Sequence, residues 1–277
     1  MASVTNRIGE TSQPRGGYLS LNRFAVGLFD DGVMLGSENI YPGITGMAVD
    51  YMTRFMVRSS GLDGRDSEFK AWALLNDSFK TSMMGAISIK QLPLAGKLLK
   101  HIGELNGISA DSWVLPNDRI NKAIISACRL VGFDVCARAG ESFYKPVEEI
   151  SPDEATIENI KTMLNRNLRF FEKYGPVVKT GFTFKGGYSD VVNKGDGDIL
   201  TENAMWDLKT SKSEPKSKET LQLLMYYIMG QHSGRDEFKN IQYVGVFNSR
   251  LNKSYRLAVS DIPAETINAV KNEVICY

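Results

Sequence analysis

Apolar residues recur at helical spacing through the first part of the chain, and the pattern changes after residue 175. Residues 18–29 and 44–57 are read as two helices joined by a polar stretch, with Ser20 as the N-cap of the first. Residues 61–175 are helical in pattern almost throughout. The last of these helices is predicted to start in Ser151-Pro152-Asp153-Glu154, which resembles a capping box, and to end at Gly175-Pro176.

The segments after residue 175 are short, rich in β-forming residues and separated by Gly, Asn and Asp. We expect five strands there, at 177–184, 195–201, 205–212, 241–249 and 253–261. A helix over about 218–229 separates the third strand from the fourth, and a helix over 263–275 closes the chain. Strands interleaved with helices predict an α/β fold in which helices are layered on a sheet.

The length of 277 residues fits one large domain, or one domain that carries a sizeable insertion. We expect a flexible arm over 1–17 and a single domain over 18–277. Within that domain the helical stretch at about 61–175 would be the insertion.

Net charge, the length of apolar runs and the numbers of Cys and His exclude several classes of protein. The 33 basic and 32 acidic residues give a net charge of +1, which excludes a generally basic DNA-coating protein but not a local nucleic-acid site. No apolar run is long enough to cross a bilayer, and the first residues lack the apolar core of a secretory signal. Cys128, Cys136 and Cys276 have no CxxC spacing, and only two histidines are present, so we expect a reduced, cytoplasmic protein without a zinc or disulfide framework.

The candidate chemistry lies in two neighbouring strands. Alternate residues on a strand share a face, so Asp207 and Lys209 point the same way. The turn at 202–204 can fold the preceding strand back, which would place Asp198 near Asp207. Two carboxylates and one ammonium would then meet at one end of the sheet.

Two close carboxylates repel each other, and a divalent cation removes that penalty. Ligands that are all oxygen favour Mg²⁺ or Mn²⁺, here from Asp198, Asp207 and the backbone carbonyl of Leu208. Such an ion polarises a phosphate and lowers the pKa of a bound water, while Lys209 could orient that water or offset charge on the phosphate. This is the chemistry of phosphodiester hydrolysis.

Other interpretations of the same residues stay open. Asp190 is a rival for the first acid, although its longer separation from Asp207 makes Asp198 the better choice. Asp196 alternates onto the face of Asp198, as a supporting group or a turn residue. The whole set could also be a surface hairpin with a salt-bridged Asp–Lys pair.

The order of these residues resembles the PD-(D/E)XK nuclease superfamily, particularly its RecB-type branch. The pattern of an Asp on one strand and [D/E]-x-K on the next is similar to Asp198 and Asp207-Leu208-Lys209. The Q-x-x-x-Y of the following helix matches Gln222 and Tyr226, which share a helical face. A glycine followed four residues later by an acid or histidine, also found in the branch, matches Gly46 and Asp50.

The resemblance implies a restriction-endonuclease-like core, with a mixed central sheet flanked by helices, and a metal shell to which Asp50 contributes. It implies substrate contacts from Gln222 and Tyr226. Independently of the resemblance, a loop that contains Ser and Pro follows the Asp-x-Lys strand and carries Lys212, Lys216 and Lys218, which could attract a nucleic-acid backbone.

The leading hypothesis is therefore a metal-dependent nuclease that acts on nucleic acid, with DNA favoured because the resembled branch mostly cuts DNA. One alternative is a non-catalytic nucleic-acid-binding or regulatory protein on the same fold. Another is an interaction protein in which the helical insertion binds a protein partner or a second copy of the chain.

Overall fold

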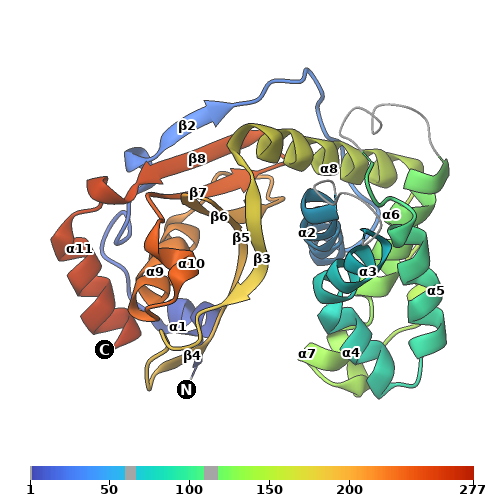
Figure 1. The fold of residues 1–277 in the computed structure, drawn as a ribbon, viewed down its shortest axis with the longest axis horizontal. Coiled ribbons are helices and arrows are strands. Elements are labelled where there is room, and N and C mark those ends of the chain that lie inside the picture. Colours follow the sequence, from blue (N-terminus) through green and yellow to red (C-terminus); the bar gives the residue numbers. More distant parts are fainter. Residues whose placement is uncertain (1, 60–66, 109–117) are drawn as a thin grey trace. The chain divides into compact units, whose positions relative to one another are not determined.

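The computed structural model describes residues 2–59, 67–108 and 118–277 and divides the chain into two compact units (Figure 1). The sheet unit consists of residues 1–31 and 175–277, and the helical unit consists of residues 32–174. The helical unit thus begins 29 residues before the expected insertion at 61–175, because the helix over 44–57 belongs to it (61 − 32 = 29).

The sheet unit has an α/β fold with a mixed sheet of six strands flanked by helices, as the strand and helix pattern predicts. Its strands are β2 (Ala25–Leu28), β3 (Val177–Thr183), β5 (Asp196–Thr201), β6 (Ala204–Lys209), β7 (Tyr243–Asn248) and β8 (Lys253–Ala258). They lie in the order β2-β8-β7-β6-β5-β3. Strands β6 and β7 are parallel, and the other neighbours are antiparallel. The strands that carry the candidate acids are therefore interior strands.

Residues 18–29 do not form the expected helix. Ser20 caps only a short 3₁₀ turn at Leu21–Arg23, and the chain then enters β2 at the edge of the sheet. A short apolar run is compatible with either a helix or a strand. Here antiparallel pairing with β8 stabilises the strand.

The N-terminal residues also differ from the expected flexible arm. Strand β1 (Ala2–Ser3) pairs with β4 (Val192–Lys194), and α1 (Val4–Glu10) follows it. Val4 and Ile8 of α1 are buried in the core of the sheet unit. Burial of these two side chains offsets the entropy lost when the segment is ordered.

Helix α9 (Ser217–His232) covers one face of the sheet. Its apolar stripe consists of Leu221, Leu224, Met225 and Ile228, all buried. The stripe belongs to the same core as Leu200, Met205 and Val244 of three adjacent strands. The short α10 (Asp236–Lys239) and the closing α11 (Ala264–Ala269), which continues into a π-helical turn at Val270–Ile275, complete this layer.

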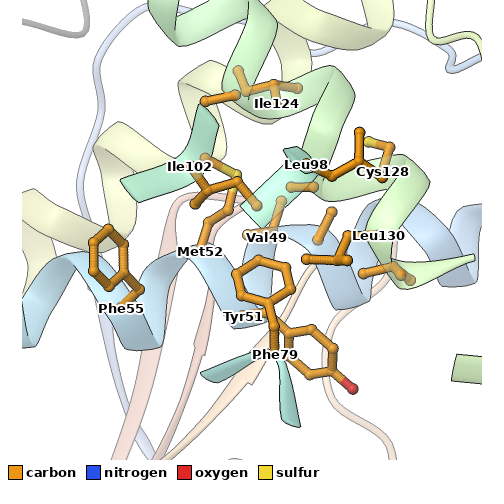
Figure 2. Packing of buried hydrophobic residues seen from close by; sticks show 14 of the residues in the cluster. Val49, Tyr51, Met52, Phe55, Phe79, Leu98, Ile102, Ile124, Cys128 and Leu130 are labelled. Atoms are coloured by element: carbon orange, nitrogen blue, oxygen red, sulfur yellow. The ribbon is translucent and has the colours of Figure 1, made fainter. Parts of the chain in front are cut away.

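The helical unit contains α2 (Pro42–Ser59), α3 (Ser67–Ser78), α4 (Lys80–Ser88), α5 (Leu92–Gly103), α6 (Asp118–Val131), α7 (Asp134–Arg138) and α8 (Glu154–Tyr174). Its core is separate from that of the sheet unit. Figure 2 shows side chains of α2, such as Val49 and Met52, packed among Ile102 of α5 and Ile124 of α6.

Helix α8 ends at Tyr174, directly before Gly175-Pro176, as predicted. Its start lies later than Ser151, because the side chain of Asp153 accepts a hydrogen bond from the Thr156 N–H at 2.8 Å. Asp153 is therefore the N-cap, and the Ser-Pro dipeptide precedes the helix.

A buried carboxylate ties three helices of this unit together. Asp134 of α7 accepts hydrogen bonds from the hydroxyls of Tyr51 on α2 and Ser82 on α4, and from Arg138 one turn further on. Burial, reinforced by the negative charge of Asp134, raises the pKa of Tyr51, so its phenol stays a donor.

No helix within the described residues is long and apolar enough to cross a membrane.

Candidate active site

The acid-bearing face of β6 is the face that α9 covers. Met205 packs in the core with α9, and alternation along the strand places Asp207 and Lys209 on the same side. In the parallel pairing with β7, Asp207 lies beside Val246, which belongs to the same core. The candidate site therefore lies between the sheet and the helix that follows it in the chain.

The β5–β6 hairpin brings Asp198 to Asp207, as the sequence predicts. Ile199 pairs with Trp206 and Leu200 with Met205, so the next position in this register sets Asp198 opposite Asp207. A hydrogen bond fixes the carboxylate: the backbone N–H of Leu208 donates to Asp198 Oδ2 at 2.8 Å.

Lys209 forms the third member of the cluster. Its Nζ lies 2.7 Å from Asp207 Oδ2, and the side chains of Lys209 and Asp207 are 27% and 4% exposed. Burial lowers the pKa of Lys209, but attraction to Asp207 and Asp198 outweighs it and raises the pKa above the ordinary lysine value. Lys209 is therefore a cation at neutral pH.

Gln222 and Tyr226 extend the site along α9. The amide of Gln222 donates a hydrogen bond to the Tyr226 hydroxyl at 2.8 Å, and the Tyr226 ring stacks on Phe184 with centroids 4.8 Å apart. Burial raises the pKa of Tyr226, and the charge of Asp207 raises it further, so the hydroxyl stays protonated. The negative charges of Asp207 and Asp198 therefore act on the Tyr226 hydroxyl of α9.

Leu208 presents its backbone to the same place. Its N–H points toward β5, where it meets Asp198. In an extended strand the N–H and C=O of one residue point to the same neighbouring strand, so the Leu208 carbonyl is also directed to the β5 side. This direction is the one expected of a backbone ligand next to Asp198.

Two predicted site residues belong to neither strand of the hairpin nor to α9. Lys212 is exposed in the loop between β6 and α9. Asp50 belongs to α2 in the helical unit, where its carboxylate forms an ion pair with Arg54 at 2.7 Å. The part of Asp50 as a further metal ligand stays a prediction.

The rival acids have different positions. Asp190 is exposed in the loop before β4, whereas Asp198 is hydrogen-bonded to the strand that carries Asp207. Asp196 is exposed at the start of β5, and its charge also raises the pKa of Tyr226. This placement favours Asp198 over Asp190 as the partner of Asp207.

Two residues next to Lys209 have no counterpart in the sequence-based prediction. Asn248, at the end of β7, pairs with Lys209 in the parallel register and is 1% exposed. Glu219, in the first turn of α9, raises the pKa of Lys209 through its charge. Asn248 could not be found from sequence, because the pairing of β7 with β6 depends on tertiary structure. Glu219 could have been found, because it lies one turn before Gln222 on the same helical face.

The donor set around Asp198 and Asp207 consists of oxygen atoms. Within residues 2–59, 67–108 and 118–277, no group of three or more His, Cys, Asp or Glu side chains is placed to hold a metal ion. A metal here would therefore take two carboxylates and backbone or water oxygens, a set that suits a hard ion such as Mg²⁺ and not zinc.

Comparison with known proteins gives no relatives: the chain matches no family model, no curated protein and no solved structure.

Proposed function

We propose that the protein is a metal-dependent nuclease that hydrolyses phosphodiester bonds of nucleic acid, with DNA as the favoured substrate. The observation that carries the proposal is the cluster on the β5–β6 hairpin. Asp198 is held 2.8 Å from the Leu208 nitrogen, and Asp207 on the facing strand lies 2.7 Å from Lys209. Two carboxylates and a charged amine in this arrangement suit phosphoryl chemistry.

We also propose that the sheet unit is a restriction-endonuclease-like core. Support comes from the order of the elements: the Asp-x-Lys strand is an interior strand of a mixed sheet, and the helix that carries Gln222 and Tyr226 follows it directly and packs on its face.

Mg²⁺ or Mn²⁺ would be held by Asp198 and Asp207, with the Leu208 carbonyl directed to the same side. Few protein ligands are needed, because Mg²⁺ keeps several of its waters. When bound, the ion would polarise a phosphate oxygen and lower the pKa of a water molecule. Asp50 remains the proposed additional ligand.

The chain's own side chains would then act on the substrate. Lys209 keeps its proton and donates hydrogen bonds, so it would orient the attacking water and offset the negative charge that grows on the phosphate. The water oxygen would form a new bond to phosphorus while the bond to the leaving oxygen breaks. The proton that the water loses would pass to solvent, and solvent would protonate the leaving oxygen. Gln222 and Tyr226 would bind substrate phosphate oxygens. Lys212 would attract the nucleic-acid backbone farther from the cleaved bond.

The proposal is tested by incubating the protein with single- and double-stranded DNA and with RNA, in the presence of Mg²⁺ or Mn²⁺. We expect cleavage by the wild type that falls at least about 100-fold in Asp207→Ala and Lys209→Ala. Asp190→Asn, which alters an exposed loop acid, is the control and should cleave normally. Absence of cleavage by the wild type on every substrate would contradict the proposal and favour a non-catalytic nucleic-acid-binding protein.

A further inference from the structure

A pocket adjoins the acid cluster at the end of β6. Its lining residues come from β6, the following loop, the first turn of α9 and the end of β7: Lys209, Ser211, Ser213, Glu214, Pro215, Lys216, Glu219 and Asn248. Lys209 therefore belongs both to the pocket and to the ion pair with Asp207. Anything bound in the pocket would lie next to the chemistry proposed above.

The loop wall of the pocket is anchored by the last residue of β7 and the two residues that follow it. The buried amide of Asn248 donates hydrogen bonds to the carbonyls of Ser211 and Ser213, at 2.9 and 3.2 Å. The Ser249 N–H donates to the Lys209 carbonyl at 3.0 Å, and Arg250 Nε donates to the Thr210 carbonyl at 2.9 Å. The carbonyls along this wall are thus tied down, so the pocket is preorganised for a ligand.

Charge around the pocket decides which ligand it suits. Glu214 forms an ion pair with Lys253, in which Oε1 lies 2.9 Å from Nζ. Glu219 Oε2 accepts from the Lys216 N–H at 2.8 Å, and the negative charge of Glu219 acts on Lys209, whose pKa it raises. By contrast, the exposed ammonium of Lys216 has no carboxylate within ion-pair distance in the described part of the chain. Lys216 is therefore a cation at the pocket whose charge is available to an anionic ligand.

The remaining polar groups of the loop wall are hydroxyls. Ser211 Oγ and Ser213 Oγ lie 3.1 Å apart, and both serines are exposed at the pocket. Hydroxyls and an ammonium are common donors to phosphate oxygens in nucleic-acid complexes.

We propose that this pocket is a subsite for the backbone phosphate next to the one that is cleaved, with Lys216 and the two serine hydroxyls as its donors. The inference rests on the proposed nuclease function for the identity of the ligand, a nucleic-acid strand. It adds the place where the uncleaved part of that strand is bound.

The test measures binding without catalysis. Fluorescence anisotropy of a labelled oligothymidylate of roughly 16 nucleotides is followed in EDTA at several salt concentrations. We expect Lys216→Ala to bind several-fold more weakly and to reduce the slope of log affinity against log salt by about 0.7, the loss of one phosphate contact on a single strand. Lys185→Ala is the matched control, because Lys185 is exposed, in the same unit and not part of the pocket.

A second variant distinguishes binding in the pocket from a general effect of charge on binding. Ser213→Phe would fill the pocket without changing charge, and it should weaken binding although Ser213 is exposed and the fold should tolerate the change. Wild-type binding by either Lys216→Ala or Ser213→Phe would overturn the subsite, and so would an oligonucleotide that the wild type does not bind.

The outcomes distinguish this inference from the proposed function. Weaker binding by both variants without any cleavage in Mg²⁺ or Mn²⁺ would retain the subsite and reject the nuclease. Cleavage by the wild type, together with unchanged binding by the variants, would retain the nuclease and reject the subsite.

Discussion

Lys209 shares one face of the sheet with two carboxylates, Asp207 on its own strand and Asp198 on the neighbouring strand, and its positive charge stabilises the folded state that holds them together. Because its side chain is 27% exposed while that of Asp207 is only 4% exposed, removing the amine leaves Asp207 buried beside a second acid. We expect Lys209→Met to lower the free energy of unfolding by about 2 kcal/mol. Urea denaturation at neutral pH measures this, and an unchanged midpoint would contradict the ion pair.

The same pair predicts a pH dependence. The folded protein holds the pKa of Lys209 above its ordinary value, so the stabilisation is complete below pH about 10 and is lost as the pH rises through the folded-state pKa. The difference in unfolding free energy between wild type and Lys209→Met should therefore be constant from neutral pH to about pH 10 and shrink above it. A difference that stays constant or grows as the pH rises above about 10 would show that the pKa is not raised.

Tyr226 tests the helix side of the cluster. Tyr226→Phe keeps the ring that stacks on Phe184 and removes only the hydroxyl that accepts from Gln222, so we expect a loss of about 1 kcal/mol in unfolding free energy. Tyr226→Ala also removes the buried ring and should cost about 3–5 kcal/mol. Equal losses in urea denaturation of the two variants would contradict the packing described here.

At the scale of elements, close contacts between helices determine where small residues are required. A Cβ at Gly85 of α4 would lie 1.9 Å from the Phe133 carbonyl, whereas a Cβ at Gly96 of α5 meets no atom within 4 Å. We expect Gly85→Ala to lower the free energy of unfolding by about 1–3 kcal/mol, because the backbone must shift. Gly96→Ala should raise the free energy of unfolding by about 0.5–1 kcal/mol through helix propensity. Thermal denaturation of the two variants measures both effects, and a stabilised Gly85→Ala would contradict the packing.

The elements differ in how much of them can be predicted from sequence. The β5–β6 hairpin follows from local signals, since polar turn residues separate two β-rich runs and alternation fixes which residues share a face. The Gln222–Tyr226 pair likewise follows from helical spacing. These local rules predicted the juxtaposition of Asp198, Asp207 and Lys209 that the structure contains.

Other elements depend on distant partners. Strand β2 is an ambiguous apolar run that becomes a strand because β8 lies beside it, and α1 is ordered by burial of Val4 and Ile8. The parallel pairing of β6 with β7, which brings Asn248 to Lys209, joins segments that α9 and α10 separate in the chain. No local pattern encodes that pairing, so the pocket beside Lys209 could not be predicted.

At the scale of the whole molecule, each unit has its own core. The helical unit is one continuous segment, residues 32–174, with a buried cluster contributed by its own helices. We expect this fragment, expressed alone, to give a helical circular dichroism spectrum and to unfold cooperatively in urea. A gradual transition without a baseline would show instead that the helices need the sheet unit to fold.

The central claim is that Asp198 and Asp207 together bind a divalent cation beside Lys209. Electron paramagnetic resonance of Mn²⁺ measures free and bound ion directly and needs no substrate. The wild type should bind Mn²⁺, Asp198→Asn and Asp207→Asn should each weaken that affinity at least about tenfold, and Asp190→Asn should leave it unchanged. Wild-type affinity in Asp198→Asn, or no binding by the wild type, would contradict the account.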